Sequence, residues 1–271
     1  MFIDDEFARR FHGDAGRGPA GMRQRVRAAS AACTGSRSAD QSDDHAAKSA
    51  ERVLRGLDPA GTEPDLGLAQ IAVVYASSSL EGCDDAMKVA WARYARATRE
   101  SLCGPVHPFT VGAALVLAEA YERCAVRAVS AGGRVALYEH AAAAYRSLIA
   151  LYERLVMPRD AERARIRLAV CRHAAGGCGE AIRLAEMCWQ TWMRTPRRLP
   201  PDGCSFAARY AAMLQACGRQ TEAVAVAQQA RSLLPAGHMP GAMPFTLAFE
   251  DVSRRPHEAV CAARLTWDQS W

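Results

Sequence analysis

The sequence is poor in lysine, in aromatic residues and in long apolar runs. Only Lys48 and Lys88 are lysines, so arginine carries almost all of the positive charge. Aromatic residues make up 7% of the 271 residues, and the formal net charge is only +5. Proteins dedicated to nucleic acid usually have a strongly basic face, so this mild charge argues against that class. No window approaches about 18 consecutive apolar residues, so no membrane span is predicted.

The sequence also lacks a CxxC pair and a signal peptide. Its start, MFIDDEFARRF, is acidic and has no long apolar run. Ten cysteines are scattered along the chain. Without an export signal they are predicted to be reduced thiols that fill small holes, in a cytoplasmic protein. We read the abundance of alanine and arginine as high-GC bacterial coding.

The common catalytic motifs are missing as well. The sequence contains no GxSxG elbow, no P-loop, no GxGxxG after a strand and no HExxH helix. No strand pattern is present on which an α/β active site would be built. The sequence therefore favours a protein that is not an enzyme, and we expect no cofactor.

What the sequence has is helical periodicity. Half of its residues are apolar, and good helix formers dominate. We predict an all-α protein with three parts: a short helix and a flexible linker over 1–44, a helical repeat domain over 45–235, and capping helices over 236–271. The linker SAACTGSRSADQSDD has almost no large apolar residue. Asp43 or Asp44 is predicted to cap a helix that runs from His45 to about Leu57.

Within the repeat domain the apolar period, caps and breakers predict antiparallel helix pairs. The predicted helices begin at Asp65 and Pro108 and span Asp85–Leu102, Leu137–Leu155, Asp160–Ala174, Glu180–Met193, Phe206–Ala216 and Thr221–Leu234, with a looser stretch over Ala125–Arg134.

The third and fourth pairs repeat at a constant offset of 42 residues. Arg167-Leu168-Ala169 aligns with Arg209-Tyr210-Ala211, and Gly176 aligns with Gly218. A constant offset is what a solenoid requires, because each helix pair packs on a neighbour of the same shape.

These residues resemble the tetratricopeptide repeat, in the 42-residue version of kinesin light chains and of bacterial regulators. The linker of that version reads Leu-Gly-x-x-His-Pro followed by Thr or Val. Leu102 to Thr110 matches it, with one extra residue between Leu and Gly. The first-helix pattern of large apolar, small and aromatic residues is matched by Ile71-Ala72-Tyr75 and by Leu117-Ala118-Tyr121, while Arg172 replaces the third aromatic. The second-helix alanines are Ala86, Ala141, Ala181 and Ala223.

The resemblance implies a right-handed superhelical solenoid whose first helices line a concave groove. Carried over position by position, it predicts an acidic patch (Glu119, Glu122) that faces a basic one (Arg163, His173). The Lys and Asn residues by which some arrays grip a C-terminal carboxylate are absent at these positions. The groove residues predicted to be exposed include Val73, Leu115, Glu119, Glu122, Arg163, Ile166, Val170, His173 and Gln215, together with Ala69, Ala208 and Ala212.

Two other features have structural alternatives. The segment from Arg159 to Arg198 contains nine arginines and only four acidic residues. They form either a site for an acidic partner or a solvated helix surface, and we favour the latter. Cys171, His173, Cys178 and Cys188 contain metal-ligand types, but they lack CxxC spacing, so we predict no metal site.

The resemblance implies a scaffold, adaptor or regulator that binds a protein or peptide segment in its groove. A ligand-sensing transcriptional or signalling regulator and an auxiliary protein of a biosynthetic enzyme remain alternatives. Nucleic acid and membranes are not expected partners. Homodimerisation, through the C-terminus or the helix that carries Trp189 and Trp192, is left open.

Overall fold

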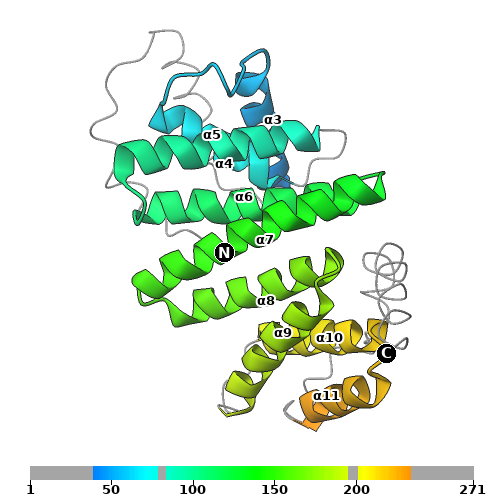
Figure 1. Ribbon diagram of the computed structural model, residues 1–271. Helices are drawn as coiled ribbons and strands as arrows, with labels where there is room; N and C mark the ends of the chain where they lie inside the picture. Colours follow the sequence, from blue (N-terminus) through cyan, green and yellow to red (C-terminus); the bar gives the residue numbers. More distant parts are fainter. Residues whose placement is uncertain (1–38, 79–83, 195–200, 233–271) are drawn as a thin grey trace. The chain divides into compact units, whose positions relative to one another are not determined.

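The described part of the chain is entirely helical. The computed structural model describes residues 39–78, 84–194 and 201–232, and all regular secondary structure in these ranges is α-helix (Figure 1). None of the described helices is long and apolar enough to cross a membrane. The predictions for residues 1–38 and for the capping helices over 236–271 lie outside the described residues. The chain divides into two compact units, Met1–Ala120 and Tyr121–Trp271, which we describe separately.

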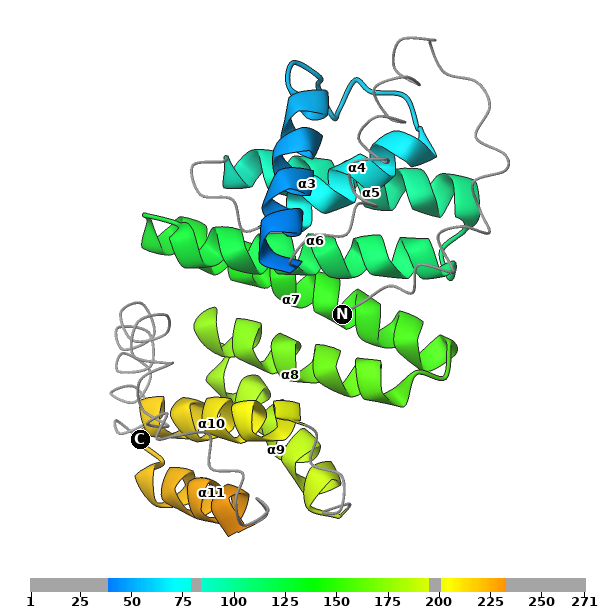
Figure 2. The same cartoon turned by 180° about the vertical axis from the view of Figure 1, so that it is seen from behind.

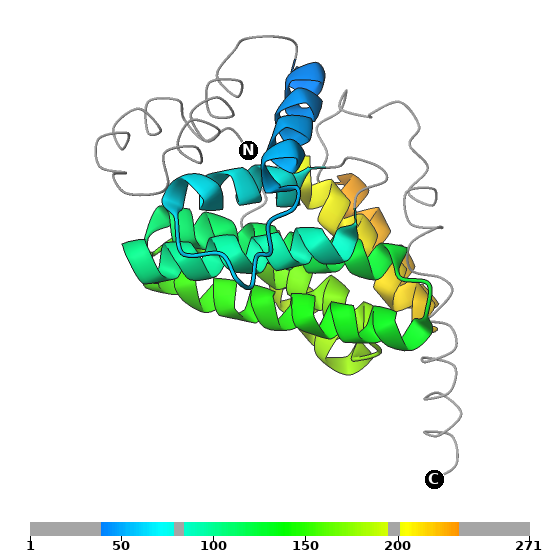
Figure 3. The ribbon, with the colours of Figure 1, turned by 90° about the horizontal axis from the view of Figure 1, so that it is seen from above.

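The first unit is built on one antiparallel helix pair and one crossing helix. Figures 2 and 3 show α3 crossing α4 and α5 at a steep angle. Its helices are α3 (Ala39–Leu54), α4 (Leu66–Ser77), α5 (Asp85–Cys103) and most of α6 (Pro108–Arg127). The prediction that Asp43 or Asp44 caps the first helix is wrong, because α3 already begins at Ala39. Once the packed part of this helix has formed, each added residue gains a hydrogen bond at little cost.

Small and aromatic residues form the core of the first unit, as the repeat pattern predicted. Ala72 is fully buried, and Trp91 and Tyr94 pack edge to face at 5.3 Å between ring centroids. One predicted packing position is wrong: Ala86 is exposed. Lys88, the fourth residue of α5, is instead 3% exposed and donates to the Ser78 carbonyl oxygen at 3.0 Å. Its apolar stem packs inside while its ammonium group keeps a partner.

The His-Pro linker between α5 and α6 has a structural role, as predicted. Gly104 ends α5 at φ 93°, a conformation that favours glycine. The Thr110 hydroxyl donates to the Gly104 carbonyl oxygen at 2.8 Å, and the Phe109 N–H donates to His107 Nδ1 at 3.3 Å. Arg99, only 5% exposed, donates to the Phe109 carbonyl oxygen at 2.9 Å. Burial lowers the pKa of Arg99 to about 10.

The second unit contains the third and fourth helix pairs. The looser stretch predicted over Ala125–Arg134 is mostly helical, because the Ser130 side chain caps α7 by accepting from the Gly133 N–H. The remaining helices begin within three residues of their predicted starts, except α10, which begins five residues early. The elements of this unit are the end of α6, α7 (Ala131–Arg154), α8 (Pro158–Ala174), α9 (Cys178–Met193), α10 (Pro201–Ala216) and α11 (Gln220–Ser232).

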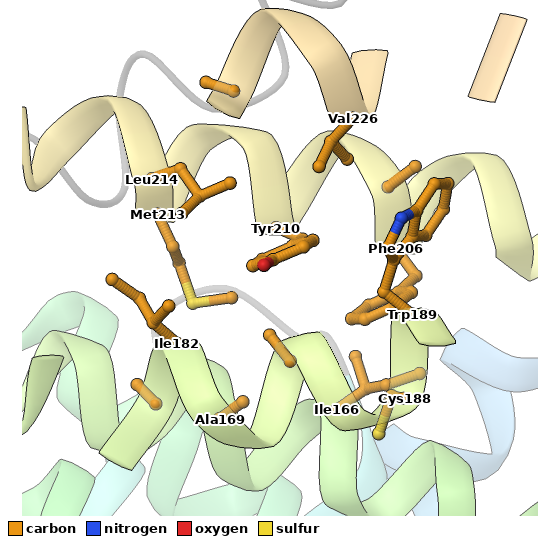
Figure 4. Close-up of a cluster of buried hydrophobic side chains, with 14 of the residues drawn as sticks. Ile166, Ala169, Ile182, Cys188, Trp189, Phe206, Tyr210, Met213, Leu214 and Val226 are labelled. Atoms are coloured by element: carbon orange, nitrogen blue, oxygen red, sulfur yellow. The ribbon is translucent and has the colours of Figure 1, made fainter. Parts of the chain in front are cut away.

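The core of the second unit joins α8 and α9 to α10 and α11. Figure 4 shows Phe206 and Tyr210 of α10 pointing toward Trp189 and Ile166. Trp189 is 3% exposed, and the Trp192 ring meets Phe206 edge to face at 4.8 Å. These two tryptophans therefore hold the two pairs together, and Trp189 is not available on the surface that was considered for homodimerisation.

Candidate peptide-binding face

A polar cluster joins α6, α7 and α8 in the second unit. Glu122, near the end of α6, accepts a hydrogen bond from the Tyr145 hydroxyl of α7 at 2.9 Å. It also accepts one from Arg167 Nη1 of α8 at 3.2 Å. The Glu122 side chain is 14% exposed and that of Arg167 is 35% exposed, so this pair is only partly screened by water. One carboxylate thus connects three successive helices.

Electrostatic effects place a fourth helix in the same cluster. The pKa of Arg209, on α10, is lowered first by burial and then by the charge of Arg167, while Glu122 opposes the shift. Burial, and then the charge of Glu122, raise the pKa of Tyr138 to about 12. The Glu122 carboxylate therefore acts on two guanidinium groups, those of Arg167 and Arg209. We name Glu122, Tyr145, Arg167 and Arg209 the Glu122 cluster.

The structure corrects the predicted basic side of this face. His173 is 3% exposed, and its Nε2 lies 3.3 Å from Cys217 Sγ, so it is not on the groove surface. Arg163 is exposed, but it pairs with Asp160 of its own helix at 3.7 Å. Glu122 instead pairs with Arg167. The basic side chain that Glu122 contacts is therefore Arg167, which the sequence interpretation did not name as a groove residue.

The other predicted groove residues of the second unit differ in exposure. Ile166, at 8% exposed, belongs to the hydrophobic core, so its predicted exposure is wrong. Val170, Ala208 and Ala212 are half-buried, and Gln215 is exposed. In the first unit Val73, Leu115 and Glu119 are half-buried, whereas Ala69 is fully buried, against prediction.

Two arginines of α8 form ion pairs with carboxylates of the neighbouring helices α7 and α9. Arg165 pairs with Glu153, and Arg172 bonds Glu139 at 2.5 Å and Glu180 at 2.7 Å. The bonds to Glu180 are the main reason that the pKa of Arg172 is raised. Arg172, which replaces the repeat aromatic, therefore links α8 to α7 and α9 by charge rather than by ring packing.

A second group of side chains, of types that can bind a metal ion, lies at the turns of the second unit. Among the described residues, the ligand atoms of His173, Cys178 and Cys217 lie within 4.8 Å of one another. The sequence interpretation had grouped His173 and Cys178 with Cys171 and Cys188. Those two cysteines are instead buried in the core, at 0% and 3% exposed.

Comparisons with known proteins agree with the repeat pattern. No protein-family model and no curated protein matches the chain. Among solved structures it is similar to the nearly identical TPR-like repeats of a putative kinesin light chain from Podosopora anserina. The identity is 18% and the TM-score 0.57, over 80% of this chain and 97% of that one. A Gln-to-Met variant of the same repeats gives 18% and 0.57, with 80% and 96% covered. The chain therefore has the TPR-like fold, an all-α solenoid of antiparallel helix pairs.

Proposed function

We propose that this protein is a scaffold or adaptor that binds a protein segment along the first-helix face of its second unit. The single observation that supports this proposal is the Glu122 cluster, which gathers side chains from α6, α7, α8 and α10. TPR-like folds generally serve protein–protein interaction, so a bound segment is the simplest use of such a face.

The charges of the cluster favour a segment with an acidic side chain. Arg167 and Arg209 supply two positive charges, and Glu122 offsets one of them. A partner carboxylate is attracted to these two guanidinium groups, and a guanidinium group binds a carboxylate through two parallel hydrogen bonds. Partial burial strengthens this contact relative to one in open water. Half-buried Val170, one turn after Arg167 on α8, adds apolar contact.

A peptide-display selection tests the proposal. We expect the full chain to select peptides enriched in Asp and Glu. Their affinity should fall about 10-fold in Arg167→Ala and in Arg209→Ala, because a charged hydrogen bond contributes about 1.5 kcal/mol or more. It should also fall as salt is raised.

The matched control is Arg55→Ala. Arg55 pairs with Glu51 on the exposed surface of α3, in the first unit. This variant loses an ion pair and a positive charge without touching the cluster, so its affinity should equal that of the unchanged protein. Selected peptides without acidic enrichment, or equal affinities for all three variants, would contradict the proposal. Circular dichroism of each variant separates lost binding from lost folding.

A further inference from the structure

Three potential metal ligands converge at two successive repeat turns of the second unit. His173 lies in the last turn of α8, Cys178 is the first residue of α9, and Cys217 follows the last residue of α10. His173 Nε2 is 3.3 Å from Cys217 Sγ, and all three ligand atoms lie within 4.8 Å of one another.

The repeat brings these residues together although Cys217 is far from the others in sequence. Gly176 and Gly218 close the two equivalent turns at φ 88° and 75°. His173 and Cys178 flank the first turn, and Cys217 directly precedes the glycine of the second. Because the two helix pairs stack in the same orientation, their turns become neighbours.

We propose that His173, Cys178 and Cys217 form a binding site for a divalent zinc-type ion. Zinc binds thiolate sulfur at about 2.3 Å and imidazole nitrogen at about 2.0–2.1 Å, so tetrahedral ligand atoms lie roughly 3.5–3.8 Å apart. The present separations fall within about 1 Å of this geometry. Small side-chain rotations therefore complete the site without movement of a helix.

The burial of the three residues suits an ion that enters from solvent. His173 is 3% exposed, whereas Cys178 and Cys217 are half-buried. Two soft sulfurs and one imidazole match the ligand preference of zinc over that of magnesium or calcium. Three protein ligands leave the fourth position to a water molecule or an added ligand. Binding releases the two thiol protons, so affinity rises with pH.

The consequence is a link between the third and fourth helix pairs. The ion joins the α8–α9 turn to the end of α10, at the place where His173 already contacts Cys217. A ligand that binds only the folded state raises its stability with concentration. The site is independent of the Glu122 cluster, so its test does not depend on the proposed function.

The experiment is a zinc titration of the full chain. The protein is stripped with a chelator, kept reduced with a phosphine, and titrated with Zn²⁺ against a chromophoric competitor. We expect one zinc per chain and a rise of about 5 °C or more in the thermal midpoint. Co²⁺ in the same site should give visible tetrahedral bands and a thiolate charge-transfer band.

Serine variants identify the ligands. Cys178→Ser and Cys217→Ser should each weaken binding by about 100-fold or more, since even outer-shell changes cost 10- to 100-fold. The matched controls are Cys103→Ser and Cys124→Ser, which alter half-buried cysteines elsewhere in the chain. They should bind zinc as the unchanged protein does.

Several results would overturn the proposal. They are substoichiometric zinc in the reduced protein, unchanged affinity in the Cys217→Ser variant, or a Co²⁺ spectrum without sulfur ligation. A Cys178–Cys217 disulfide found by mass spectrometry, with no zinc binding after reduction, would assign the pair to redox chemistry instead.

Discussion

Phe206 is a buried aromatic side chain of α10 that contacts the tryptophans of α9. It is 2% exposed, and its ring lies 4.8 Å from that of Trp192 and 6.3 Å from that of Tyr210, between centroids. We expect Phe206→Ala to destabilise the protein by about 3–4 kcal/mol. Returning a buried Phe ring to water costs about 2–3 kcal/mol. A residual cavity of about 50 Å³ adds roughly 1 kcal/mol, since half-buried Trp192 has room to relax into part of the space.

The assay is equilibrium urea unfolding followed by circular dichroism, with tryptophan fluorescence as a second probe. Phe206→Leu keeps most of the volume and should cost about 1 kcal/mol. The control is Met187→Ala on α9, where Met187 is 57% exposed and the expected change is within about 0.5 kcal/mol. Trp189 and Trp192, beside the substituted ring, are two of the five tryptophans that contribute to the fluorescence.

The test compares the stability losses of these three variants. If Phe206→Ala loses no more stability than Met187→Ala, the ring does not hold α10 against α9. If Phe206→Leu loses as much as Phe206→Ala, a specific ring contact rather than filled volume stabilises the interface. Either result refutes the packing argument in its present form.

Three further predictions concern backbone, charge and thiols. Gly112→Ala should raise the stability by about 0.5–1 kcal/mol, because the added methyl group meets open space within α6. Gly104→Ala should lower the stability by about 1 kcal/mol, because Gly104 has a φ of 93°. Thermal melts measure both changes, and the same sign for both would contradict this prediction. Burial acts to raise the pKa of Glu180, but the hydrogen bond and charge of Arg172 outweigh it and lower the pKa. Its stabilising effect is therefore present above the pKa of the unfolded chain and lost as the pH falls through the lower folded value, and Glu180→Gln should flatten acid denaturation in that window. Burial raises the pKa of Cys188 to about 12, so iodoacetamide at neutral pH should label it only after unfolding, as read by mass spectrometry; labelling of the native protein would contradict its burial.

The helix pairs were predictable because their signals are local and repeated. Asp65 caps α4, and Asp84 and Gly104 cap the two ends of α5, each at the position that its residue type indicates. The start of α3 was missed because its first residues have no apolar pattern. The helix extends there because its later part packs, which is information that a local window does not contain.

The candidate site was predictable only in part, and one repeat position shows why. Glu122, His173 and Gln215 all stand five residues after the large apolar residue of their first helix. The resemblance assigned all three to the groove. In the structure Glu122 joins the polar cluster, His173 is buried against Cys217, and Gln215 is exposed. The repeat sets the backbone position, whereas the neighbouring helices decide what the side chain contacts.

Arg167 and Arg209 could have been found from the sequence. The 42-residue offset aligns them, and two cations at equivalent positions of successive first helices lie on the same face of a stacked array. Cys217 was harder to find. Its partners lie about one repeat away, so only the stacking of turns, and no short spacing, connects it to them.

Departures from the repeat pattern therefore fall into two physical classes. Arg172 replaces an aromatic residue, but its ion pairs with Glu139 and Glu180 restore the link between helices that the ring would have made. Its removal should change stability. Arg209 makes none of these cross-helix pairs with Glu139 or Glu180 and adds charge beside Arg167 and Glu122, so its removal should change what the face binds while the fold persists. A stability measurement beside a binding measurement on Arg172→Ala and Arg209→Ala separates the two classes. If both variants lose stability equally, the Glu122 cluster is structural and the proposed binding face lies elsewhere.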